Sequence, residues 1–556
     1  MQSGTLYKDK RFLVVDDQRP FQVMLKGILL NLGVKEVQMV TNGEAAISAA
    51  KNHEFDFILV DYNLGGHRKN GRQVIEEIKT KKLVPPHCIS IMVTGENHRP
   101  MVLGAIELQP DDYVMKPFSQ NVLKHRLDKA LHKRTNLLPI YQAMHEENFE
   151  QAMNECTRLI SENNRYRNFC NNLLAELLCK QKQYEQAEYL LTKLLKVKPY
   201  TWGQIQLART YHHQGKHQQA IVIATEVMKQ APMIIDSYDL MAEAFHASGD
   251  LTHSLEMAIR AAELSPYSVE RQYRLCQIAQ SSDMHDIAKD ACKAILEMTR
   301  KSVQQDSVHL LNYIRATINA AEHSEEKSEQ NKLKQEAVIA LQRAKQDELI
   351  GNINNYSVFE TLCNARIEAM DKHLIAAKKQ LFKVMSAHAQ DEEATDDPYA
   401  YEKLSLLYTM GEYELAEHVA DECKDERVNK NPFIKNTISH LKQENKKRQR
   451  GFKQLNQAGI DAYKKQDYIL AFHQFDSALK FAPMHTGGTL NLILAIIKLI
   501  ETSEKQPEDL LKRIKAAFQA LDGIELPSKQ FERYKELEKQ YHSLMEKLNP
   551  PQKKWR

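Results

Sequence analysis

Short runs of β-branched and aromatic residues alternate with segments of helical spacing over the first 130 residues. The runs occupy 12–15, 37–40, 55–60, 89–93 and 113–115. Between them, segments such as 23–32 and 43–52 place apolar residues at intervals typical of amphipathic helices. Because strands that alternate with helices assemble into parallel sheets covered on both faces, this pattern predicts a doubly wound α/β domain.

Polar residues follow several of the predicted strands at the point where each strand ends. Asp16 and Asp17 follow the first run, Asp61 the third, Thr94 the fourth and Lys116 the fifth. In an open parallel sheet with strand order 2-1-3-4-5, ligands bind outside the carboxyl ends of strands one and three. Three carboxylates there repel one another unless a cation neutralises them, and oxygen ligands favour Mg²⁺. With the ammonium and hydroxyl groups nearby, the site is predicted to hold a transferred phosphoryl group.

Four motifs resemble the receiver domain of two-component response regulators, over about residues 10–130. They read FLVVDD, FILVDYN, MVTG and DDYVMKPF, in the order and near the spacing usual for that family. The resemblance implies a CheY-like, flavodoxin-like domain with a five-stranded parallel sheet of order 2-1-3-4-5.

The resemblance also assigns the phosphoryl-acceptor and metal-binding roles. Asp61 would be the phosphoacceptor, taking the group from a phosphohistidine on a sensor histidine kinase. Asp16, Asp17, Asp61 and the backbone carbonyl of Asn63 would bind Mg²⁺. One departure lies in the loop after Asp61, where Gly65 stands in place of the usual proline.

Further residues would respond to the phosphoryl group or control its lifetime. Thr94 and Lys116 would sense it, and Tyr113 would be the aromatic switch whose rotation couples the site to a distal surface. Asn63 and Glu96 occupy the positions that tune dephosphorylation in the family. Every residue needed for phosphorylation is present, which favours an active receiver over an inert one.

The chain from about residue 137 onward is predicted to be all-helical, with a repeat of about 34 residues. Small residues recur at intervals of 33, 34 and 34, each preceded about twelve positions earlier by another small residue. The later set is Ala187, Ala220, Ser254 and Ala288, and the earlier set is Ala175, Ala208, Ala242 and Cys276. Antiparallel helices approach closely where small side chains face each other, so the pattern resembles tetratricopeptide (TPR) repeats.

The repeats predict a division of the chain into four parts. A receiver at 8–133 precedes TPR-like repeats at 137–300, a divergent helical segment at 301–397, and C-terminal TPR-like repeats with terminal helices at 398–556. The third part fits either divergent repeats or a spacer of paired helices. Stacked helix pairs form a superhelix that holds a peptide or helix of another protein, so a protein ligand is expected.

Composition limits the possible functions. The 556 residues carry a net charge of only +3, and 42% are hydrophobic, as in ordinary globular proteins. No motif of a DNA-binding domain or a catalytic output is recognisable, so nucleic-acid binding is disfavoured and no enzyme activity beyond phosphoryl acceptance and hydrolysis is expected.

Eight cysteines without a CxxC pair indicate reduced core thiols. The start has no apolar leader, which favours a cytoplasmic protein without membrane insertion.

The sequence therefore predicts a phosphorylation-controlled signalling protein that regulates a protein partner through its helical region, without a DNA-binding output. Two alternatives remain open. The protein could be a modulator that binds the kinase or competes for phosphoryl flow to another regulator, or a constitutive scaffold with an inert receiver. A homodimer is also compatible with the repeats.

Overall fold

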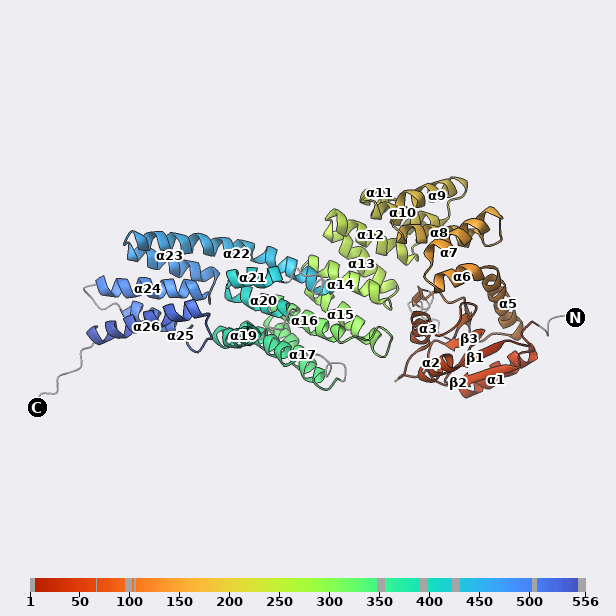
Figure 1. Ribbon diagram of the computed structural model, residues 1–556, viewed down its shortest axis with the longest axis horizontal. Helices are drawn as coiled ribbons and strands as arrows, with labels where there is room; N and C mark the ends of the chain where they lie inside the picture. Colours follow the sequence, from red (N-terminus) through yellow and green to blue (C-terminus); the bar gives the residue numbers. More distant parts are fainter. Residues whose placement is uncertain are drawn as a thin grey trace, which may run out of the picture. The chain divides into compact units, whose positions relative to one another are not determined.

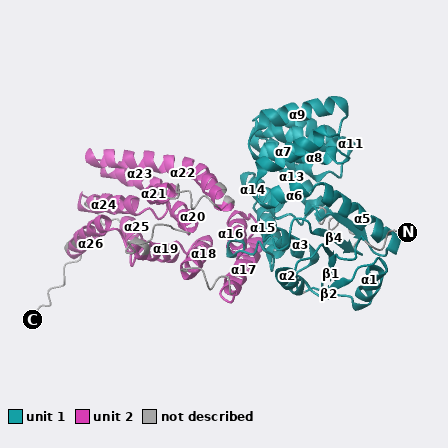
Figure 2. Ribbon diagram, turned by 45° about the vertical axis from the view of Figure 1, so that its right-hand side comes forward, with its two compact units in different colours: residues 1–309 teal, residues 310–556 magenta. Residues whose placement is uncertain are grey.

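The computed structural model describes residues 6–66, 68–95, 103–104, 107–347, 356–389, 399–422, 431–502 and 508–548. These residues form two compact units, 1–309 and 310–556, which Figure 2 distinguishes by colour. The first unit contains an α/β domain and ten helices that follow it, and the second is helical.

A five-stranded parallel sheet forms the centre of the α/β domain. Its strands are β1 (Arg11–Val15), β2 (Glu36–Val40), β3 (Phe57–Asp61), β4 (Ile89–Thr94) and β5 (Asp112–Met115), in the order β2-β1-β3-β4-β5. Val15 pairs with Val40 on one side and with Val60 on the other, which aligns the carboxyl ends of three strands. The predicted fold class is confirmed, and each predicted strand lies within two residues of the observed one.

Helices cover both faces of this sheet (Figure 1). They are α1 (Arg19–Asn31), α2 (Gly43–Asn52), α3 (Gly71–Thr80) and α5 (Gln120–Asn136). Leu13 and Val15 of β1 pack with α2 and α3, whereas Phe12 and Val14 pack with α1 and α5. This alternation follows from the two-residue period of a strand, and it produces two apolar cores that fix the strand ends in place.

The helices that follow in the first unit pack as consecutive pairs. They are α6 (Leu138–His145), α7 (Phe149–Ser161), α8 (Arg167–Lys180), α9 (Tyr184–Val197), α10 (Thr201–His213), α11 (His217–Gln230), α12 (Ile235–Ser248), α13 (Leu251–Leu264), α14 (Val269–Ser281) and α15 (His285–Thr299). Every small residue of the two predicted repeat sets is buried. The Ser254 hydroxyl donates to the Ala242 carbonyl across the α12–α13 pair at 2.7 Å, so a small polar residue is accommodated there.

The second unit continues the helical region. Its helices are α16 (Ser307–His323, beginning just before the boundary), α17 (Lys327–Ala344), α18 (Tyr356–Met370), α19 (Leu374–Ala389), α20 (Ala400–Met410), α21 (Tyr413–Glu422), α22 (Pro432–Lys464), α23 (Tyr468–Phe481), α24 (Thr486–Thr502), α25 (Glu508–Gln519) and α26 (Ser528–Leu548). Buried ion pairs join Arg315 to Glu402 at 2.6 Å and Lys378 to Glu412 at 2.7 Å. The acidic stretch 391–397 lies outside the described residues. The TPR assignment and the four domain boundaries stay predictions.

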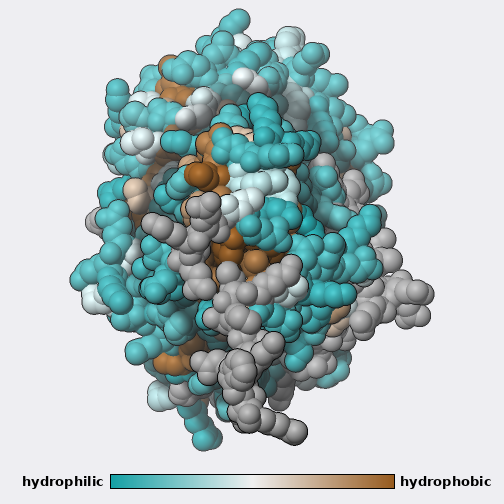
Figure 3. Space-filling view, turned by 90° about the vertical axis from the view of Figure 1, so that its left-hand side faces the viewer, coloured by the Kyte–Doolittle hydropathy of each residue, from teal (hydrophilic) through white to brown (hydrophobic). Residues whose placement is uncertain are grey.

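The surface drawn in Figure 3 is mainly hydrophilic, with small separate hydrophobic patches. Among the described residues, no helix combines the length and apolar character that crossing a membrane requires. The seven described cysteines are free thiols, and all but Cys179 are buried, as expected for reduced core residues. Cys423 lies outside the described residues.

Candidate functional site

Three carboxylates meet at the carboxyl ends of β1 and β3. Asp16 follows β1 directly, Asp61 is the last residue of β3, and Asp17 lies beside them on the exposed side. Asp16 and Asp61 are 1% and 5% exposed, so both carboxylates are largely removed from water. Oxygen atoms of all three side chains lie within 4.8 Å of one another. The structure thus brings together the acids that the sequence placed at strand ends.

The Lys116 ammonium group contacts two of these carboxylates. It donates to Asp16 Oδ2 at 2.6 Å and to Asp61 Oδ2 at 2.7 Å. The same ammonium lies 3.7 Å from the centroid of the Phe21 ring, whose face attracts a cation. Phe21 thereby covers one side of the site, a role that no sequence motif indicated.

Hydrogen bonds hold Asp16 in place. The Gln18 backbone N–H donates to Asp16 Oδ1 at 2.8 Å. The Gln22 side-chain amide donates to the Asp16 carbonyl at 2.6 Å and to the Val40 carbonyl at 2.9 Å. Gln22 therefore joins the ends of β1 and β2. Its role could not be predicted from the sequence, because a glutamine in an amphipathic helix carries no signal of such a bridge.

The electrostatics of Asp61 favour a bound cation. Burial raises the pKa of Asp61, Lys116 opposes that rise, and the Asp16 carboxylate adds to it; the pKa remains above its ordinary value. One ammonium does not neutralise three carboxylates, so the cluster retains excess negative charge. Carboxylate oxygens so close together are the donor set that a hard divalent ion takes, and the residues present fit Mg²⁺.

The loop after Asp61 is tightly fitted to the strand end. The Asn63 backbone N–H lies 3.4 Å from Asp61 Oδ1, and the Gly71 N–H donates to the Tyr62 carbonyl at 2.9 Å. A Cβ atom at Gly71 would lie 2.0 Å from the Asp61 carbonyl oxygen, so only glycine fits. Gly65 has a φ of +87°, which proline cannot adopt, and this accounts locally for the departure from the family pattern.

The remaining predicted residues lie around this cluster. Thr94 ends β4 and is 2% exposed, and its carbonyl accepts from the Lys116 N–H at 2.8 Å. Tyr113 is half-buried and packs against the core on the α2–α3 face of the sheet. Asn63 is exposed, and Glu96 lies outside the described residues. The roles assigned to these side chains stay predictions.

A buried arginine of the helical region contacts the α/β domain. Arg271 of α14 donates to Glu107 at 2.7 Å, to Asp239 at 2.8 Å and to the Ser265 carbonyl at 2.8 Å. Leu103, four residues before Glu107, packs against the apolar core of α10 to α13. The described residues after β4 are therefore attached to the helix pairs by this ion pair, by a hydrogen bond that the Ser265 hydroxyl donates to Glu107 at 3.0 Å, and by the apolar contact of Leu103.

Helix α3 makes a second set of contacts to the same helical region. The Gln73 amide donates to the carbonyls of Met298 and Arg300 at 3.3 and 3.1 Å. Lys69, just before the helix, donates to the Lys301 carbonyl at 2.6 Å. Since α3 begins at Gly71 against Asp61, the end of α15 is linked to the acidic cluster through one short helix. No local sequence signal marks these contacts, which join residues more than 220 positions apart.

Comparison with known proteins gives matches over the α/β domain. The family model described as the response regulator receiver domain matches residues 12–128. Chemotaxis protein CheY-3 of Vibrio cholerae is 29% identical over 128 residues, covering 23% of this chain and 96% of that protein. A chemotaxis protein CheY homolog of Campylobacter jejuni is 30% identical over 122 residues, covering 22% of this chain and 92% of that protein. A solved CheY-like receiver domain protein from Methanospirillum hungatei is 25% identical with a TM-score of 0.21, covering 23% of this chain and 96% of that structure.

Proposed function

Because the chain belongs to the response regulator receiver family through residues 12–128, we propose that Asp61 accepts a phosphoryl group from a histidine kinase. The receiver supports phosphorylation-controlled two-component signalling, and the helical region is proposed to be a TPR superhelix that regulates a protein partner. The observation that carries the proposal is the cluster of Asp16, Asp17 and Asp61 with Lys116 at the strand ends.

Asp16, Asp17, Asp61 and the Asn63 backbone carbonyl would hold Mg²⁺ in this site. When bound, the ion supplies positive charge that offsets both the carboxylates and an incoming phosphoryl group. Asp17 is the exposed member of the cluster, so it would be the carboxylate most accessible to an ion from solvent.

In the proposed reaction, an Asp61 carboxylate oxygen attacks the phosphorus atom of phosphohistidine. An O–P bond forms, the N–P bond breaks, and the electron pair of that bond leaves with the imidazole, which takes up a proton. Lys116 then balances charge on the phosphoryl oxygens, and the Thr94 hydroxyl donates to them. Hydrolysis of the acyl phosphate returns the carboxylate and releases inorganic phosphate, with Asn63 and Glu96 tuning its rate.

The proposed output is protein binding without DNA binding. Tyr113 and the segment containing Glu107 would change position on phosphorylation, and Arg271 would pass that change to the helix pairs. A shift of a few kcal/mol is enough to invert a modest population bias between two receiver conformations. The receiver must meet the histidine kinase in the compartment where the kinase uses ATP. We therefore propose a cytoplasmic location.

The test is phosphorylation of the full-length protein by a small-molecule phosphodonor with MgCl₂. Intact-mass spectrometry should show the gain of one phosphoryl group, which hydroxylamine removes because the product is an acyl phosphate. Asp61→Asn should abolish the gain, and chelation of the metal should prevent it.

Asp9→Asn is the matched control, since Asp9 is an exposed carboxylate outside the cluster. This variant should gain one phosphoryl group, as the wild-type protein does. Full labelling of Asp61→Asn, or labelling that resists hydroxylamine, would refute Asp61 as the acceptor.

A further inference from the structure

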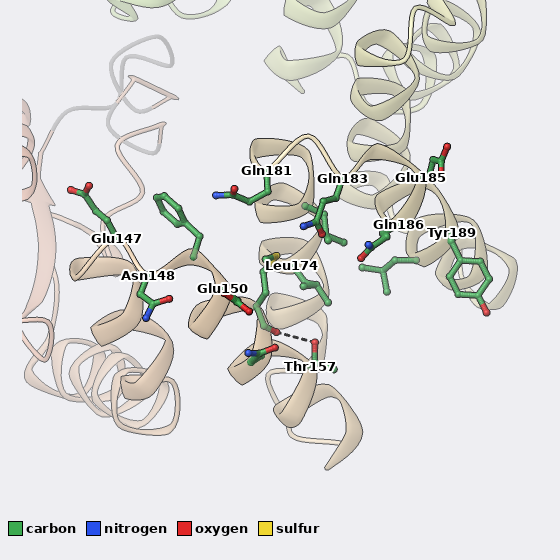
Figure 4. Close-up of a pocket in the computed structure, with 15 residues that line it drawn as sticks. Glu147, Asn148, Glu150, Thr157, Leu174, Gln181, Gln183, Glu185, Gln186 and Tyr189 are labelled. Carbon is green, nitrogen blue, oxygen red and sulfur yellow. Dashed lines mark hydrogen bonds between the residues drawn. The ribbon is translucent and has the colours of Figure 1, made fainter.

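A cavity of about 920 Å³ lies among α7, α8 and α9, on the helical region of the first unit. Figure 4 shows Glu147, Asn148 and Glu150 on one side of it and Glu185, Gln186 and Tyr189 on the other, with Leu174 between them. The cavity is thus bordered by two neighbouring helix pairs, and a segment lying in it would touch both.

The inner surface of this cavity is apolar. It is formed by five side chains, of which Leu178 is only 6% exposed. The five are Phe149, Met153, Leu174, Leu178 and Leu190. Tyr189 stands at the border with 71% of its surface exposed, so its ring is open to a ligand. Apolar side chains of a bound segment would lose contact with water here.

The border of the cavity is acidic and rich in amides. Glu147, Glu150 and Glu185 contribute three carboxylates, and none of the fifteen lining residues, all of them described, is Lys or Arg. Glu147 pairs with Lys82 at 2.7 Å. Within the described residues, Glu150 and Glu185 are exposed and form no ion pair, so two carboxylates face the cavity without a cation.

A neighbouring lysine offsets part of this charge. Lys180 of α8 lies with its ammonium 4.1 Å from the centroid of the Phe149 ring, and Lys82 and Lys180 together lower the pKa of Glu147, so the carboxylates of Glu150 and Glu185 carry the acidic character of the border. An anionic ligand would meet the carboxylates of Glu150 and Glu185 and no lining cation. A cationic ligand finds carboxylates, and it also finds the open face of Tyr189, which attracts Lys and Arg.

We propose that this cavity among α7, α8 and α9, called the groove from here on, binds a basic amphipathic segment of a partner protein. Apolar residues of the segment lie on Leu174 and Leu178, while its Lys or Arg residues pair with Glu150 and Glu185. Side-chain amides of the border, such as Asn154 and Gln186, offer hydrogen bonds to the peptide backbone. This inference rests on the proposed partner-binding role of the helical region and specifies the partner's chemistry.

The experiment is a fluorescence-anisotropy titration of full-length, unphosphorylated protein. The probe is a labelled synthetic peptide with leucines at helical spacing and Lys or Arg at the other positions; its counterpart carries Glu at those positions. The basic peptide should bind, more weakly as salt rises, and the acidic peptide should bind at least about tenfold more weakly.

Two variants locate the site. The double variant Glu150→Gln/Glu185→Gln removes two exposed ion pairs and should weaken binding of the basic peptide about fivefold. Tyr189→Ala should weaken it about threefold, and its exposure means that the fold does not depend on it. The matched control is Glu226→Gln/Glu256→Gln, which makes the same charge change on exposed residues of α11 and α13.

Equal binding of both peptides, unchanged binding by the groove variants, or an equal loss in the control would each overturn the proposal. So would concentration-dependent dimerisation that the groove variants abolish, because a second copy would then fill the groove. Asp61→Asn should bind the peptide as wild type does. Failure of peptide binding with normal labelling at Asp61 would therefore refute the groove alone, and the reverse result would refute phosphoryl acceptance alone.

Discussion

Lys116 is the residue that balances charge in the acidic cluster, since it contacts both Asp16 and Asp61. Replacing it by glutamine leaves three carboxylates facing one another with no ammonium. We expect Lys116→Gln to bind Mg²⁺ about tenfold more tightly, because the ion no longer competes with a fixed positive charge. Calorimetric titration with MgCl₂ measures this change. Lys35→Gln, an equal charge change at an exposed position, should leave the affinity unaltered. Equal affinities in all three proteins would contradict the proposed metal site.

Gly71 shows why residue identity near Asp61 is restricted by packing. Alanine is the better helix former, and Gly71 is the first residue of α3, so helix propensity alone favours Gly71→Ala. The added Cβ would overlap the Asp61 carbonyl oxygen, however, and we expect a loss of about 3 kcal/mol in local stability. Hydrogen exchange of the β3 amides should accelerate accordingly.

Gly66→Ala is the control for that substitution. Gly66 lies in the same loop, and a Cβ there meets nothing within 4 Å. In Gly66→Ala, the β3 amides should exchange at the wild-type rate. Exchange at the wild-type rate in Gly71→Ala as well would mean that the loop can move away from Asp61 at little cost in free energy.

Left-handed turn residues mark the helix pairs of the first unit. They recur every 33 to 35 positions and include both glycine and other residues. They are Glu147, Lys182, Gly215, Gly249 and Asp283, each with φ between 58° and 84°. A side chain in this conformation costs about 1 kcal/mol, which glycine avoids.

This recurrence predicts opposite effects of two substitutions. Lys182→Gly should stabilise the helix pairs by about 1 kcal/mol, and Gly215→Ala should destabilise them by a similar amount although the added methyl meets no atom. Trp202 of α10 lies between these turns in the sequence, so urea unfolding followed by its fluorescence reports both changes in a Trp555→Phe background. Changes of the same sign would contradict the conformational argument.

The elements that the sequence predicted well are those with a local signal. Strand positions follow from β-branched runs, and the acids of the site follow from their place directly after a strand. The small residues of the repeats are buried because close helix pairs need them. The basic stretch 442–450 lies within the single helix α22, where Lys446, Lys447 and Arg448 are exposed.

The contacts between the receiver and the helix pairs could not be predicted in this way. Glu107 and Arg271 are 164 positions apart, and nothing in either local sequence marks the other as its partner. An ion pair between a buried arginine and a partly exposed carboxylate depends here on how two separately specified folds pack together. The same holds for Gln73, whose partners are backbone carbonyls and therefore leave no pattern in the sequence.

Residues 1–309 form one compact unit, and within it these contacts join the receiver to the helix pairs. If phosphorylation repositions the segment that carries Leu103 and Glu107, Arg271 loses a partner while it keeps Asp239. Beryllofluoride with Mg²⁺ mimics the phosphoryl group, and we expect it to accelerate hydrogen exchange at the α13–α14 junction about tenfold. Asp61→Asn should show no such response.

Breaking the contact directly should have a similar effect without the mimic. Glu107→Gln removes the charge that pairs with Arg271, which is 7% exposed at its side chain, and should accelerate exchange at the same junction. Glu263→Gln is the matched control, since it removes the carboxylate of an exposed ion pair on α13 at the same charge change. Because exposed pairs contribute little, its exchange should stay at the wild-type rate. If beryllofluoride leaves the junction unchanged in the wild-type protein while Glu107→Gln loosens it, the contact is structural only, and the signal from Asp61 must leave the receiver by another surface.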